Sequence, residues 1–133
     1  MGINLSENRL RWALVAAWTG VIFLASTGMA GTWADIVYAA IFGASDQPGS
    51  APGHFLAQKA FHVFLFAVLG WLVSPLVRGK QVRRLVLSTS FCLVVGTVSE
   101  GLQLFSDARE PRFSDVLLNG LSGALSSLVS ILT

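Results

Sequence analysis

The sequence predicts an all-α fold, a polytopic membrane protein with four transmembrane helices. Of the 133 residues, 53% are hydrophobic and only 12% are charged, whereas a soluble domain carries about 25% charged residues. The mean hydropathy is +0.67. Four apolar stretches are each long enough to cross a bilayer core, which takes about 20 helical residues. We therefore expect a single membrane domain over residues 1–133.

The first span is expected at about residues 12–29, directly after Arg9 and Arg11. A secretory signal peptide has a similar cationic start, and Gly28-Met29-Ala30 supplies a small-residue cleavage pattern. The apolar run is longer than the usual hydrophobic core of a signal peptide. We therefore expect the span to be retained.

A short amphipathic helix is expected next, in the first outer loop. Apolar residues recur there at helical spacing, at Trp33, Ile36, Val37, Ala40 and Ile41. Such a helix is expected to lie flat at the membrane interface.

Three further spans are expected at about residues 57–77, 85–105 and 116–132. The positive-inside rule sets their orientation. Six cations fall on one side of the membrane, at Arg9, Arg11, Arg78, Lys80, Arg83 and Arg84. The other side holds Arg109 and Arg112, with Lys59 at a span boundary. Both termini are therefore expected in the cytoplasm, and the net charge of +2 is too small to indicate nucleic-acid binding.

Polar side chains gather at the expected outer ends of spans two, three and four. Within each span they share a helical face, because they are three or four residues apart. The candidate ligand-binding residues are Lys59, His62, Glu100, Gln103, Arg109, Asp115 and Asn119. A charged side chain that faces lipid costs about 2.5 to 3.5 kcal/mol near the helix centre. We therefore expect Lys59 to pair with Glu100, and Arg109 with Asp115.

Small residues continue these faces inward and predict the helix contacts of the bundle interior. Span four carries Asn119, Ser122, Ser126 and Ser130 at helical spacing, and span three carries Cys92 and Gly96 among others. Cys92 is the only cysteine, so the chain cannot form an internal disulfide.

The residues resemble the VanZ-like family of small bacterial membrane proteins. The resemblance runs through Lys59-x-x-His62, the segment Glu100-Gly101-Leu102-Gln103-Leu104-Phe105, Arg109, and Asp115-x-x-x-Asn119-Gly120. Arg112 departs from the family pattern, which tends to have a small residue there. The resemblance implies a VanZ-like domain in the bacterial cytoplasmic (inner) membrane. It also implies a role in the cell envelope, since the family's namesake is linked to glycopeptide-antibiotic resistance.

Three functions follow from these residues. An outward-facing pocket with Arg109 and Lys59 as cations could hold the phosphate of a lipid-linked envelope precursor. A membrane enzyme for phosphoryl or acyl transfer could use His62, Glu100 and Asp115 as catalytic residues, although no known nucleophile motif is present. A structural subunit could use the same ion pairs to hold helices or a membrane protein partner together.

We favour recognition of an anionic envelope ligand, with membrane lipids around the bundle. His62, Glu100 and Asp115 could also ligate a divalent cation. Lys59 competes for the same carboxylates, so we expect neither a metal nor a cofactor.

Overall fold

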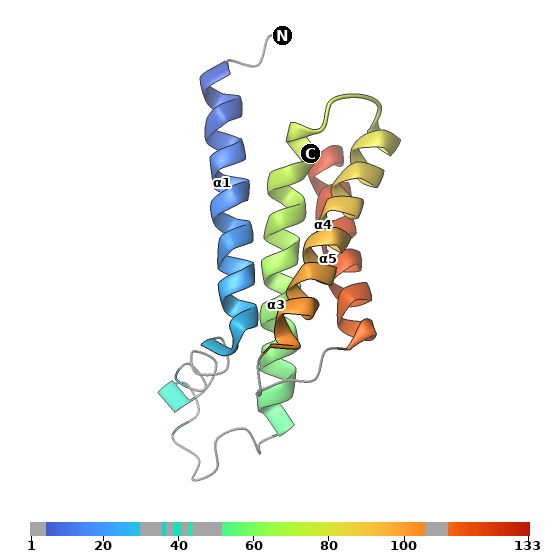
Figure 1. Ribbon diagram of the computed structural model, residues 1–133. Helices are drawn as coiled ribbons and strands as arrows, with labels where there is room; N and C mark the ends of the chain where they lie inside the picture. The colour runs from blue at the N-terminus through green and yellow to red at the C-terminus, as the bar shows by residue number, and fades with distance from the viewer. Residues whose placement is uncertain (1–4, 30–35, 37–38, 41–42, 44–51, 106–111) are drawn as a thin grey trace.

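A computed structural model describes residues 5–29, 36, 39–40, 43, 52–105 and 112–133 (Figure 1). Its long helices are α1 (Leu5–Leu24), α3 (Pro52–Val73), α4 (Gln81–Gln103) and α5 (Phe113–Leu132). A π-helical turn, η1 (Ala25–Met29), extends α1, and a 3-10 turn, η2 (Ser74–Leu76), extends α3.

Among the described residues, four segments are long and apolar enough to cross a membrane: Ser6–Thr27, Lys59–Leu76, Gln81–Gln103 and Phe113–Leu132. These segments coincide with the four expected spans, and the part of the chain that the structure describes contains no strand. The predicted all-α fold is confirmed. The expected interfacial helix lies largely outside the described residues, although Ile36 and Ala40 within it are helical.

The cationic tract after α3 differs from the sequence-based expectation, which began the third span at residue 85. Helix α4 already begins at Gln81, so Arg83 and Arg84 belong to its first turn. The turn before it depends on Gly79, whose φ of 124° lies in a region that side chains disfavour. The Nε of Arg84 donates a hydrogen bond to the Ser74 carbonyl at 3.2 Å. This side chain therefore ties the two helices together at the loop, a contact that the cation count did not predict.

The core is formed by apolar side chains from α1, α3 and α4. Helix α5 packs along both α3 and α4, whereas α1 lies further from these three helices and contacts mainly α3 (Figure 1). Trp18 of α1 donates its indole N–H to the Leu65 carbonyl of α3 at 2.9 Å. The buried apolar residues are Val15, Ile22, Leu65, Phe66, Leu69, Val73, Cys92 and Val95.

Glycine allows α3 and α5 to approach closely. A Cβ added at Gly70 would lie 2.3 Å from the carbonyl oxygen of Gly123, a backbone atom that cannot turn aside. A Cβ added at Gly123 would lie 2.5 Å from Sγ of Cys92 on α4. The three helices therefore meet where their side chains are smallest, as is usual for helices that pack in lipid.

Serine hydroxyls connect the helices across this contact. Ser126 donates to the Ala67 carbonyl at 2.5 Å, and Ser127 donates to the Gly70 carbonyl at 3.1 Å. The hydroxyls of Ser26 in η1 and Ser99 in α4 are 2.5 Å apart. Such interhelical bonds contribute on average about 0.6 kcal/mol each in a membrane protein. They fix the rotation of the helices as well as adding stability.

Candidate functional site

The candidate site is a group of six polar residues at one end of the bundle, which we call the polar cluster. The first half of α3, the last turn of α4 and the first turns of α5 all lie at this end (Figure 1). Helix α3 contributes Lys59 and His62, and α4 contributes Glu100 and Gln103. Helix α5 contributes Asp115 and Asn119. The start of α1, the end of α5 and the α3–α4 loop lie at the opposite end (Figure 1).

An ion pair lies at the outer edge of the polar cluster. The Nζ of Lys59 is 2.5 Å from Oδ1 of Asp115, and the two side chains are 28% and 29% exposed. Ser114 also donates its hydroxyl to Oδ1 of Asp115, at 3.4 Å. This ion pair joins α3 directly to α5. The sequence predicts Glu100 as the partner of Lys59, whereas the ion pair within the described part of the chain is made with Asp115. The predicted pair of Arg109 and Asp115 lies outside the described residues and stays a prediction.

Glu100 lies deeper and is only 5% exposed. Its Oε1 accepts a hydrogen bond from the Gln103 amide at 3.2 Å, and its Oε2 accepts one from the backbone N–H of Arg112 at 3.3 Å. Arg112 is the N-cap residue of α5. The carboxyl group of Glu100 therefore lies at the N-terminal end of α5, where the backbone N–H groups need acceptors.

His62 and Asn119 form the inner layer of the polar cluster. His62 is 9% exposed, and Asn119 is completely buried. Within the part of the chain that the structure describes, neither Oδ1 nor Nδ2 of Asn119 has a hydrogen-bond partner. Leaving a buried amide unpaired costs about 1–3 kcal/mol. The stability of the fold alone therefore does not explain why position 119 carries an amide.

Arg109, the remaining candidate, lies outside the described residues. Among the residues that the structure does describe, no group of three His, Cys, Asp or Glu side chains could hold a metal ion. Lys59 is the cluster's cation, and its ammonium group can be reached from outside. The exposed side chain of Arg112 adds a second positive charge at the same end of the bundle.

Two hydrogen bonds at this end of the bundle were not predicted from the sequence. The backbone N–H of Arg112 binds Glu100, and the Ser26–Ser99 hydrogen bond attaches η1 to α4 one residue before Glu100. The first could have been sought from the position of Arg112 just before the fourth span, since the N–H groups at a helix start need acceptors. The second has no sequence signal, because nothing in the sequence indicates which serines of the different spans face one another.

The comparison with protein families gives one match. The VanZ/LLP1 family matches residues 11–133, which include most of α1, the whole of α3, α4 and α5, and the whole polar cluster. No curated protein and no solved structure matches the chain.

Proposed function

Because this chain belongs to the VanZ/LLP1 family, we propose that it is a cell-envelope membrane protein that recognises the phosphate of a lipid-linked ligand. The ion pair between Lys59 and Asp115 carries the proposal, since both side chains are partly exposed. Exposed ion pairs contribute only about 0–1 kcal/mol. A phosphate that reaches Lys59 can therefore replace Asp115 as its partner at little cost in stability.

The chemistry of the nearby groups suits a phosphate on a lipid. Lysine provides a compact ammonium with three donors, and arginine provides a planar fork that binds two phosphate oxygens. Lys59 and Arg112 lie at one end of helices that are apolar enough to span a membrane. A ligand with a phosphate at the interface and a long apolar tail in the bilayer matches this arrangement. A protein that holds such a ligand would also alter susceptibility to glycopeptide antibiotics.

Lys59→Gln and Asp115→Asn are expected to change ligand binding in opposite directions. Loss of Lys59 removes a charge-assisted hydrogen bond, so affinity for a polyprenyl phosphate should fall about ten- to a hundredfold. Asp115→Asn removes the competing anion, so affinity should rise. The measurement is binding of polyprenyl phosphate to the full chain in detergent, with the uncharged polyprenol as the reference ligand.

Matched controls are available at the other end of the bundle. Lys80 and Glu7 are exposed there, and Lys80→Gln and Glu7→Gln make the same charge changes away from the polar cluster. Both controls should leave binding unchanged. A purely structural ion pair would give a different pattern, in which Lys59→Gln and Asp115→Asn lower thermal stability alike and neither alters binding. That pattern would contradict the proposal.

The orientation proposed with this function places the polar cluster outside a bacterial cytoplasmic membrane and both termini inside. It is supported by the cations at the opposite end, where Arg9, Arg11, Arg78, Lys80 and Arg83 are exposed. An excess of Lys and Arg in short loops is typical of the cytoplasmic side. The outward-facing cluster would then meet envelope precursors on the side where the wall is built.

Cysteine labelling in intact bacterial cells tests this orientation. Phe105, next to the polar cluster, is 90% exposed, and the native Cys92 is fully buried and should give little background. We expect Phe105→Cys to react with a membrane-impermeant maleimide in intact cells. Lys80→Cys should react only after the cells are permeabilised. The reverse pattern, or labelling of both positions in intact cells, would show that the orientation is wrong.

A further inference from the structure

The start of α5 is held by a carboxyl group from another helix. Arg112 is the N-cap residue of α5, and within the described residues its side chain makes no capping hydrogen bond. The first N–H groups of a helix have no partner inside the helix and need other acceptors. The backbone N–H of Arg112 donates to Oε2 of Glu100, in the last turn of α4, at 3.3 Å. Glu100 therefore caps α5 from a neighbouring helix.

Glu100 is itself held in place from within α4. The Gln103 amide donates to its Oε1 at 3.2 Å, and both side chains are buried. One residue earlier, the hydroxyl of Ser99 lies 2.5 Å from the hydroxyl of Ser26 in η1. The carboxyl group of Glu100 therefore has a fixed direction toward the start of α5.

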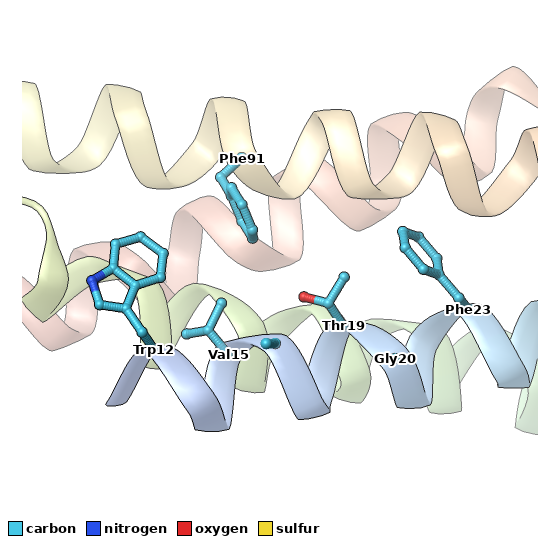
Figure 2. A pocket seen from close by; sticks show the side chains of 7 residues that line it. Trp12, Val15, Thr19, Gly20, Phe23 and Phe91 are labelled. Atoms are coloured by element: carbon cyan, nitrogen blue, oxygen red, sulfur yellow. The ribbon is translucent and has the colours of Figure 1, made fainter. Parts of the chain in front are cut away.

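The contact between Ser26 and Ser99 attaches the last turns of α4 to the first span. Farther along the two helices, a hollow of about 400 Å³ lies between α1 and α4. Figure 2 shows Phe91 of α4 opposite Val15 and Thr19 of α1 across this hollow. Since α4 contacts the first span mainly at η1, the serine contact positions the end of α4 that carries the polar cluster.

A chain of polar contacts runs from Glu100 to Lys59 through the first turn of α5. The N–H of Asp115 donates to the carbonyl of Arg112 at 2.9 Å, which closes this turn. Oδ1 of Asp115 then pairs with Nζ of Lys59 on α3, at 2.5 Å. The same turn of α5 is thus attached to α4 by Glu100 and to α3 by Lys59.

These two attachments differ in what happens to them when a phosphate binds. A phosphate that replaces Asp115 at Lys59 removes the attachment of this turn to α3. The glycine contact of α5 with α3, at Gly123, lies eight residues beyond Asp115, about 12 Å along the helix. The hydrogen bond from Arg112 to Glu100 would then keep the first turn of α5 in place, with the Arg112 guanidinium beside the phosphate.

We propose that Glu100 is a positioning residue of the phosphate site, whose hydrogen bond keeps Arg112 in place while the ion pair opens. This role rests on the proposed function, because it requires a phosphate at Lys59. It suits a carboxyl group that is only 5% exposed and bonded to the backbone of α5. A site that is ordered beforehand loses less conformational entropy when it binds. Glu100 therefore raises the affinity for phosphate without touching it.

Glu100→Asp tests this role, because it keeps the carboxyl group but shortens the side chain by one methylene. The shorter side chain should no longer reach the N–H of Arg112. We expect the affinity of the full chain in detergent for polyprenyl phosphate to fall about tenfold, as for one lost hydrogen bond. Affinity for the uncharged polyprenol should not change, because the positioned groups bind only the phosphate. A merely structural role would not alter the ratio of the two affinities.

Ser127→Ala is the matched control for a loss of stability. It removes the hydrogen bond to the Gly70 carbonyl, farther along α5, and should lower thermal stability without changing either affinity. Gln103→Leu is a milder second variant, since it removes the donor to Oε1 but leaves Glu100 in the chain. It should lower affinity for polyprenyl phosphate about threefold, as for a typical hydrogen bond in a membrane protein.

A double variant tests whether Glu100 acts through Arg112. Arg112→Gln removes the guanidinium but keeps the backbone N–H that binds Glu100. In this background Glu100→Asp should lower affinity for polyprenyl phosphate by no more than about twofold, because the group that it positions is gone.

Four results would overturn the role of Glu100. Unchanged affinity in Glu100→Asp would make Glu100 a structural residue, and a rise would show that its carboxyl group opposes the ligand. An equal fall in polyprenol affinity would show that the variant damages the fold. The same loss with and without Arg112→Gln would show that Glu100 acts elsewhere. The proposed function fails by a different result, namely unchanged phosphate binding in Lys59→Gln and Asp115→Asn.

Discussion

Gly70→Ala is expected to destabilise the fold by about 3 kcal/mol or more, at the upper end of the cost of overpacking. The added Cβ would lie 2.3 Å from the Gly123 carbonyl oxygen and 2.9 Å from its Cα. All three nearest atoms belong to the backbone of α5, so relief requires that the two helices move apart. That movement would also stretch the Ser127–Gly70 hydrogen bond, which now measures 3.1 Å. Thermal unfolding of the full chain in detergent measures the loss.

Two other helical glycines provide controls, because alanine is not expected to lower stability at either position. Gly20 and Gly101 have no heavy atom within 4 Å of an added Cβ. Alanine in a helix is favoured over glycine by about 1 kcal/mol. Gly20→Ala and Gly101→Ala should therefore be neutral or stabilising. If Gly70→Ala were as stable as these two controls or more stable, helix propensity rather than close packing would govern all three positions, and the account of the α3–α5 contact would be wrong.

The spans could be predicted from the sequence because lipid imposes strong constraints. A helix that spans the bilayer must satisfy its backbone hydrogen bonds internally and must exceed a minimum length. Both properties depend only on the sequence of the segment itself. The interior face of the fourth span was harder to predict. Serines at 122, 126 and 130 indicated one face, but the buried residues are Asn119, Gly120, Ser122, Gly123 and Ser127. The glycines decide the rotation of α5, since they alone allow the close approach to α3 and α4.

The residues of the polar cluster could be predicted, but the ion pair between Lys59 and Asp115 could not. Topology alone brings Lys59, Glu100 and Asp115 to one end of the bundle. Which carboxylate meets Lys59 depends on helix rotations that the Gly70–Gly123 contact and the serine hydrogen bonds determine. Glu100 was predicted as a partner for Lys59, and the backbone of Arg112 was not considered as a donor to it. That donor exists only because α5 begins beside the end of α4.

Asn119→Ser is expected to raise stability while weakening ligand binding. The buried amide has two polar atoms without partners, at a cost of about 1–3 kcal/mol. A serine hydroxyl at this position can donate to the carbonyl four residues earlier, as Ser122 does to Leu118 at 2.7 Å. The smaller side chain leaves a small cavity that offsets part of the gain. We expect a net increase of about 1 kcal/mol in the free energy of unfolding.

The two measurements on this variant together separate a functional amide from a structural one. Proteins keep a destabilising group where their activity needs it, so a more stable variant that binds less polyprenyl phosphate would place Asn119 in the binding site. Ser122→Ala is the control, since it removes a hydroxyl whose hydrogen bond stays within α5. A fall in stability for Asn119→Ser would show that the amide is satisfied in the folded protein. In that case Asn119 would serve the packing of α3, α4 and α5, and the binding role would rest on Lys59 and Arg112.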